Sequence, residues 1–198
     1  MNTPDDRAAA FLAFITYLRI ALTPVVMAMV LVRDPAPWVE PTAALLFAFA
    51  AATDFFDGRL ARRWKQTSTF GSFLDTAADK LLVSGVVLAL VAVDRVSAWI
   101  AFVIVGRELL IMGLRGAVSA SDGIVVTPSM WGKWKATIQF VAITIAIWRP
   151  DVHIGDWYLD QWLMALAAAI TIVSAAQYLT RFLSVLSGRD RAAPSAER

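Results

Sequence analysis

The chain has 198 residues and a net charge of +2, and 59% of its residues are hydrophobic while only 17% are charged. A soluble domain carries about 25% charged residues, so a soluble helical bundle is the less favoured alternative for this chain. The small net charge gives no indication of nucleic-acid binding, and the absence of cysteine excludes disulfides and thiolate metal sites.

Six apolar segments follow one another along the chain, and most approach the roughly 20 residues with which a helix spans a bilayer. They cover residues 11–32, 39–56, 70–93, 97–118, 135–148 and 157–186. The first ten residues lack the basic region of a cleaved signal peptide, so we expect the first segment to remain as a transmembrane helix. The pattern predicts an all-α integral membrane protein. Residues 1–186 would form one six-helix membrane domain with a short N-terminal cytoplasmic segment, and residues 187–198 a polar C-terminal tail.

Positively charged residues alternate between the connections, which predicts the orientation of the helices. Lys and Arg are retained on the cytoplasmic side of a membrane. They are concentrated between the second and third segments, between the fourth and fifth, and after the sixth, whereas each other connection has a single Arg. The tryptophans lie near segment ends, where their rings can occupy the headgroup layer. We therefore expect six spans in an inner or plasma membrane, with both termini in the cytoplasm.

Four aspartates lie where the second segment ends and the third begins. Asp54 and Asp57 are three residues apart, and Asp75 and Asp79 are four apart, so each pair shares one helix face. A short connection makes the two helices antiparallel neighbours whose acidic faces can meet. Charges at membrane depth are costly unless they are compensated, and hard divalent cations suit oxygen ligands. The set predicts two Mg²⁺ or Mn²⁺ ions about 4 Å apart, which can clamp a phosphoryl-type displacement.

Two glycines and an arginine accompany these aspartates. Gly58 and Gly71 would let a bulky ligand approach the helix backbone, although tight helix packing explains them equally well. Arg62 continues the first acidic face, and its guanidinium suits a pyrophosphate. A role as a cytoplasmic anchor is the alternative for Arg62.

The pattern D-x2-D-G-x2-A-R-x8-G-x3-D-x3-D resembles the signature of the CDP-alcohol phosphotransferase family in residue type and spacing. The resemblance implies a membrane fold of six helices, a site that opens to the cytoplasmic leaflet, and a homodimer among membrane lipids. It implies that Asp54, Asp57 and Asp75 are metal ligands. Asp79 would be near the metals and act as general base on the hydroxyl of the acceptor. The residues implied to lie against the CDP moiety are Asp57, Gly58, Ala61, Arg62, Gly71 and Asp75.

Other parts of the chain resemble phosphatidylglycerophosphate synthases, the branch that transfers a phosphatidyl group from CDP-diacylglycerol to glycerol-3-phosphate. The matching pieces include Gly106-Arg107-Glu108-Leu109 and Gly132-Lys133-Trp134-Lys135, and the likeness extends over residues 16–179. We expect a basic group for the acceptor phosphate near the cytoplasmic ends of the fourth and fifth helices. Lipid headgroups are the alternative partners. The expected phosphate contacts are Arg107, Arg115, Lys133, Lys135 and Arg19, with Glu108 as the partner of Arg107.

One pair of positions departs from that branch. Leu12 and Ala13 stand where the branch usually carries a Pro-Asn pair, although Thr16, Arg19 and Pro24 match. The alternatives within the family are a cardiolipin synthase that takes phosphatidylglycerol and an enzyme with an inositol-phosphate acceptor. A divalent-cation transporter is the alternative from a different class. A transporter needs ionisable residues along a path across the membrane, whereas the outer halves of these helices are almost wholly apolar.

Overall fold

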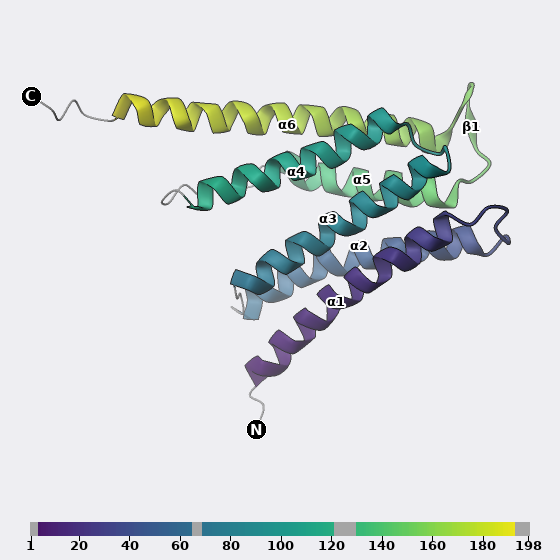
Figure 1. The fold of residues 1–198 in the computed structure, drawn as a ribbon, viewed down its shortest axis with the longest axis horizontal. Coiled ribbons are helices and arrows are strands. Elements are labelled where there is room, and N and C mark those ends of the chain that lie inside the picture. The colour runs from purple at the N-terminus through teal and green to yellow at the C-terminus, as the bar shows by residue number, and fades with distance from the viewer. Residues whose placement is uncertain (1–3, 65–68, 121–129, 193–198) are drawn as a thin grey trace, which may run out of the picture.

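A computed structural model describes residues 4–64, 69–120 and 130–192. Within these ranges the chain forms six helices and one short hairpin (Figure 1). The helices are α1 (Pro4–Val30), α2 (Val39–Trp64), α3 (Thr69–Ala92), α4 (Ala98–Ala120), α5 (Met130–Trp148) and α6 (Leu159–Ala192). The strands β1 (His153–Ile154) and β2 (Trp157–Tyr158) pair antiparallel before α6. The side chains of some helical residues, those of 54–64 and 130–135 among them, lie outside the description.

The six apolar segments are confirmed as helices, and several helices extend beyond the apolar run that predicted them. α2 continues from its apolar part through the aspartate motif to Trp64. α6 continues to Ala192, so residues 187–192 of the expected polar tail are helical. A helix satisfies its backbone hydrogen bonds internally, and Arg, Leu and Ala favour it, so the helix need not end where the apolar residues end.

The hairpin before α6 is not predicted from the sequence, in which the sixth apolar segment starts at residue 157. Trp157 and Tyr158 pair instead with Ile154 and His153. Gly155 has a φ of 66°, a left-handed conformation that glycine adopts without strain. The Trp162 indole N–H donates to the Ile154 carbonyl at 3.0 Å and ties the hairpin to the first turn of α6.

α1 lies against both of the helices that carry the aspartate motif. It packs more extensively with α2 and with α3 than those two helices pack with each other. At Gly85 of α3 an added Cβ would lie 2.8 Å from Met27 Sδ and 3.1 Å from Thr23 Cγ2 of α1, so the glycine permits this close approach. α2 and α3 are in contact, as expected from their short connection, but α1 is the principal neighbour of each.

The second group of helices is α4, α5 and α6. α6 packs against α5 and α4, and contacts between α2 and α5 join this group to the first one (Figure 1). Apolar side chains from both groups form one core between the helices. Its fully buried members include Val26, Phe47, Leu82, Val86, Ile104, Ile143 and Met164.

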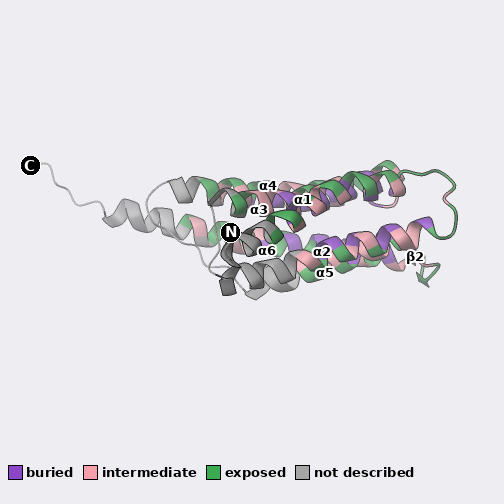
Figure 2. Ribbon diagram, turned by 90° about the horizontal axis from the view of Figure 1, so that it is seen from below, coloured by how far each residue is buried: buried purple, intermediate pink, exposed green. Residues whose placement is uncertain are grey.

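Apolar side chains also cover the outside of the bundle, where Figure 2 shows exposed residues along the outer faces of the helices. Within the described residues, two stretches, Ala13–Val30 in α1 and Leu159–Thr180 in α6, are long and apolar enough to cross a membrane. Only 28% of each stretch is buried, whereas the core helix of a soluble protein is mostly buried. The chain is therefore expected to associate with a membrane, and six spans remain a prediction.

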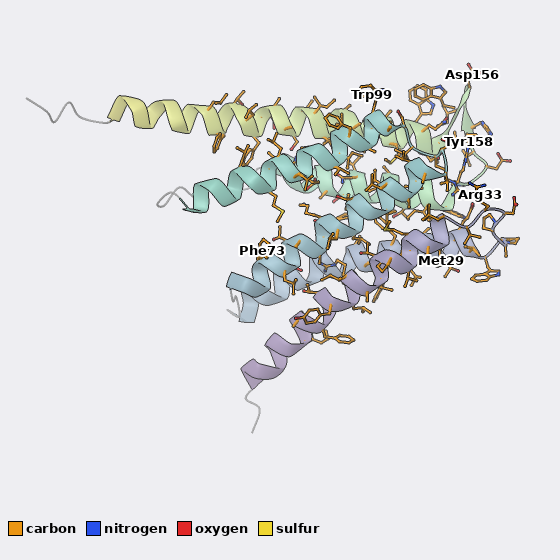
Figure 3. The ribbon with its side chains drawn as sticks, in the orientation of Figure 1. Met29, Arg33, Phe73, Trp99, Asp156 and Tyr158 are labelled. Atoms are coloured by element: carbon orange, nitrogen blue, oxygen red, sulfur yellow. The ribbon has the colours of Figure 1, made fainter. Side chains whose placement is uncertain are left out.

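One end of the bundle carries the connections 31–38, 93–97 and 149–158. Figure 3 shows Arg33, Trp99, Asp156 and Tyr158 at this end. The exposed tryptophans of these connections and the adjoining helix ends are Trp38, Trp99, Trp148, Trp157 and Trp162. The first turn of α1 and the last turn of α6 lie at the opposite end (Figure 1). This arrangement agrees with a tryptophan belt at one membrane interface and with termini on the other side.

Candidate active site

The motif aspartates lie on α2 and α3. Asp54 and Asp57 belong to the continuous helix α2, so they are three helical positions apart, and Asp75 and Asp79 lie one turn apart on α3. The helical spacing predicted for both pairs is confirmed. The side chains of Asp54 and Asp57 lie outside the described residues, so the meeting of the two acidic faces stays a prediction.

Asp75 forms an ion pair with Arg19 of α1. Arg19 Nη1 donates to Asp75 Oδ1 at 3.0 Å, and its Nε donates to the Ala50 carbonyl of α2 at 3.3 Å. The Arg19 side chain has no exposed surface, while the Asp75 side chain is 36% exposed. A buried guanidinium needs such partners because an unpaired charge in the interior is costly. Arg19 therefore joins α1, α2 and α3 beside the aspartate motif.

Asp79 is the first member of a series of polar contacts that leads to α4 and α6. Lys80 Nζ donates to Asp79 Oδ2 at 3.1 Å and also pairs with Glu108 Oε2 of α4. Asp79 Oδ1 is buried and has no hydrogen-bond partner among the residues that the structure describes. One oxygen of this carboxylate is therefore engaged and the other is available.

Arg107 continues the series toward α6. Its Nη1 donates to Glu108 Oε1 at 3.4 Å, and its Nη2 donates to Ser174 Oγ of α6 at 3.0 Å. Glu108 is only 3% exposed, which explains why it has cationic partners on two sides. The prediction that Glu108 is the partner of Arg107 is confirmed, and Lys80 is its additional partner.

The basic residues expected at the acceptor phosphate do not all lie at one depth. Arg107 lies near the middle of α4, eight residues before Arg115, which corresponds to about 12 Å along the helix axis. The prediction that Arg107 lies near the cytoplasmic helix end is therefore wrong. Arg115 belongs to the last turns of α4, and Lys133 and Lys135 belong to the first turns of α5. The side chains of all three residues lie outside the described residues. The binding of a phosphate by these four residues stays a prediction.

The described part of the site suits a divalent cation in its chemistry. Asp79 Oδ1 is a buried carboxylate oxygen with no partner in the described part of the chain, and Asp75 is partly exposed one turn away. Carboxylate oxygens are the ligands that Mg²⁺ and Mn²⁺ prefer. Among the described residues, no group of three or more acidic or histidine side chains lies close enough to hold an ion alone. The side chains of the two α2 aspartates, which the motif predicts as further ligands, lie outside the described residues.

The expected CDP-binding residues are divided between the same two helices. Gly71 is exposed near the start of α3, one turn before Asp75. Asp57, Gly58, Ala61 and Arg62 occupy successive turns near the end of α2, and their side chains lie outside the description. The structure therefore describes the α3 half of the expected CDP site and only the backbone of the α2 half.

Comparison with known sequences decides the family. A family model described as CDP-alcohol phosphatidyltransferase matches residues 12–173. The chain belongs to this family. The CDP-alcohol phosphatidyltransferases generally depend on divalent metal ions, in agreement with the acidic motif.

Relatives within the family are similar over most of their length and share one name, CDP-diacylglycerol–glycerol-3-phosphate 3-phosphatidyltransferase. One from Yersinia pestis (strain Pestoides F) is 40% identical over 175 residues, which cover 84% of this chain and 91% of the relative. One from Pectobacterium atrosepticum is 41% identical over 172 residues, with 83% and 90% covered. One from Salmonella choleraesuis is 37% identical over 170 residues, with 84% and 91% covered.

Two residues of this CDP-alcohol phosphatidyltransferase site were missed from the sequence. Lys80 follows Asp79 directly, and its charge inside a long apolar run was a signal, because ionisable residues at membrane depth have partners or functions. Ser174 of α6 gave no signal, because a serine in a membrane helix commonly forms a hydrogen bond within its own helix. Its contact with Arg107 is visible only once α4 and α6 are placed side by side.

Proposed function

We propose that this protein transfers a phosphatidyl group from CDP-diacylglycerol to glycerol-3-phosphate, which forms phosphatidylglycerophosphate and releases CMP. The observation that carries the proposal is the aspartate motif at helical spacing on α2 and α3, in a chain about two-fifths identical to enzymes with this name. The function predicted from the sequence is confirmed at this level by the names of the relatives. The protein is accordingly a transferase of phospholipid biosynthesis.

Asp54, Asp57, Asp75 and Asp79 are the residues that would hold two divalent cations, Mg²⁺ or Mn²⁺. When bound, such ions offset the negative charge of the donor pyrophosphate and of the leaving CMP. The hydroxyl oxygen of the acceptor forms a bond to the phosphorus of the phosphatidyl group, and the bond from that phosphorus to CMP breaks. Asp79 takes the hydroxyl proton as general base. The available Oδ1 of Asp79 supports this role.

The substrates would be held by residues on either side of these aspartates. Asp57, Gly58, Ala61, Arg62, Gly71 and Asp75 would contact the CDP moiety. Arg107, Arg115, Lys133 and Lys135 would receive the phosphate of the acceptor. Arg19 was expected among these phosphate contacts, but its bonds to Asp75 and Ala50 support a different role, in which it holds a metal ligand in place.

The membrane arrangement is part of the proposal. All six helices would cross an inner or plasma membrane, with the aspartates near the cytoplasmic leaflet and both termini in the cytoplasm. The exposed apolar faces and the exposed tryptophans at one end support a membrane interface there, and the greater number of Lys and Arg in the other connections supports the orientation. We also propose a homodimer, the state implied by the family resemblance.

The decisive experiment measures CMP release by the purified protein from CDP-diacylglycerol with a panel of acceptors. The panel contains glycerol-3-phosphate, phosphatidylglycerol and inositol phosphate, each with Mg²⁺, with Mn²⁺ or with EDTA. We expect release with glycerol-3-phosphate and a divalent ion, and none with EDTA. Release with phosphatidylglycerol but not with glycerol-3-phosphate would replace the proposed acceptor.

The role of Asp79 is tested in the same assay. Asp79→Asn keeps the size of the side chain but removes the general base, so turnover should fall by about 10²–10⁴-fold. Binding of CDP-diacylglycerol, measured separately, should persist. Turnover like that of the wild type in Asp79→Asn would remove Asp79 from the base role.

A further inference from the structure

Lys80 is a partly buried cation of the site, and the proposed reaction gives it no role. Its Nζ lies 3.1 Å from Asp79 Oδ2 and also pairs with Glu108 Oε2 of the neighbouring helix α4. Successive side chains on a helix point about 100° apart. Lys80 therefore contacts the carboxylate beside it only because its long side chain turns back toward Asp79.

The surroundings of Lys80 suggest that the protein holds this charge in place. A lysine near a membrane surface ordinarily extends its ammonium group into water. The Lys80 ammonium instead lies between two carboxylates, and the Glu108 side chain is only 4% exposed. Glu108 is fixed in turn by Arg107, which is bonded to Ser174 of α6. The position of Lys80 is thus determined by residues from α4 and α6.

The contact engages one oxygen of Asp79 and leaves the other open toward the proposed metal ions and the acceptor. Lys80 occupies Oδ2, while Oδ1 is buried and lacks a partner among the described side chains. A carboxylate held through one oxygen cannot rotate freely, so the other oxygen keeps one direction. Fixed orientation of a reacting group accelerates catalysis, and a small displacement is correspondingly harmful.

We propose that Lys80, held by Glu108, is a positioning residue that fixes the carboxylate of Asp79 so that Oδ1 receives the proton of the acceptor hydroxyl. The inference rests on the proposed function, because that function assigns Asp79 its role as base. It adds that α4 and α6, which carry none of the four aspartates, determine the orientation of the base through Glu108, Arg107 and Ser174.

The alternative is that Lys80 and Glu108 only tie α3 to α4. A pair of variants separates the two roles. Lys80→Met alone removes one of the two cations that pair with Glu108 and should lower both stability and turnover. Lys80→Met combined with Glu108→Gln removes both charges, so stability should recover. If Lys80 positions Asp79, kcat stays low in the double variant, by about 10–100-fold, while the KM for CDP-diacylglycerol changes little.

The conservative variant provides a rescue. Lys80→Arg keeps a cation that can reach Asp79 and Glu108, so it should retain most of the turnover. A matched control removes an ion pair away from the aspartates. Arg95 pairs with Glu40 and donates to the Ile147 carbonyl at 2.8 Å, at the end that carries the exposed tryptophans. Arg95→Met combined with Glu40→Gln should change thermal stability without changing kcat.

A measurement independent of turnover completes the test. Binding of Mn²⁺ to each purified variant is followed by electron paramagnetic resonance. We expect the Lys80→Met/Glu108→Gln variant to bind Mn²⁺ as the wild type does while its kcat remains low. Recovery of kcat together with stability, or loss of Mn²⁺ binding together with kcat, would overturn the inference. Absence of CMP release by the wild type would instead refute the proposed function.

Discussion

The ion pair between Arg19 and Asp75 allows a quantitative prediction for Arg19→Met. The variant loses a hydrogen bond between charged groups, worth about 1.5–3 kcal/mol, and one to the Ala50 carbonyl, worth about 1 kcal/mol. Asp75 is partly exposed and can be solvated once Arg19 is gone, so the lower part of this range applies. We expect a loss of roughly 2–3 kcal/mol, which at about 2–4 °C per kcal/mol lowers the unfolding midpoint by roughly 4–12 °C.

Thermal unfolding in detergent, with Arg19→Met, Asp75→Asn and the double variant, tests this estimate. If the two residues interact as described, the effects of the single changes are not additive, and the coupling energy is about 1 kcal/mol or more. Arg33→Met is the control, because Arg33 is an exposed arginine in the connection that follows α1. Additive effects, or an Arg19→Met midpoint no lower than that of Arg33→Met, would refute the reasoning.

The remaining predictions concern helix packing and the membrane. Gly85→Val should lose about 1–3 kcal/mol of stability in the same unfolding assay, because its side chain would meet Thr23 and Met27 of α1. Gly113→Ala, where an added Cβ meets nothing within 4 Å, should not be destabilising. Fluorescence of Trp99, isolated by replacing the other tryptophans with phenylalanine, should be quenched more by quenchers at the lipid headgroups than at the bilayer centre. Quenching that is strongest at the centre would contradict the proposed interface.

The sequence was sufficient to predict the helices and the family, because each depends on patterns that are local in the chain. Apolar runs predicted six helices, and an eight-position motif predicted the family. The ends of the helices were harder to predict. α2 passes through Asp57 and Gly58 to Trp64 because helix formation does not stop at the edge of an apolar run.

Contacts between distant residues could not be predicted from these patterns. Arg19 and Asp75 are separated by 56 positions in the sequence, and their contact depends on α1 packing against both α2 and α3. An arginine in an apolar helix is equally consistent with a phosphate contact, which is the role that the sequence predicts for Arg19. The pairing of Lys80 with Glu108 likewise required the placement of α3 beside α4.

The charges of the described site bear on where the metal ions would bind. The carboxylates of Asp75, Asp79 and Glu108 are matched by the cations of Arg19, Lys80 and Arg107 through the ion pairs that connect them. This part of the site supplies carboxylate oxygens but is close to neutral, so most of the charge that attracts a divalent cation would come from α2. Asp54 and Asp57 would add negative charge from α2 and complete the proposed ligand set. We therefore expect Asp57→Asn to weaken Mn²⁺ binding more than Asp79→Asn does, in the same paramagnetic resonance measurement. The opposite order would mean that α3, in spite of its cations, provides most of the binding energy for the ions.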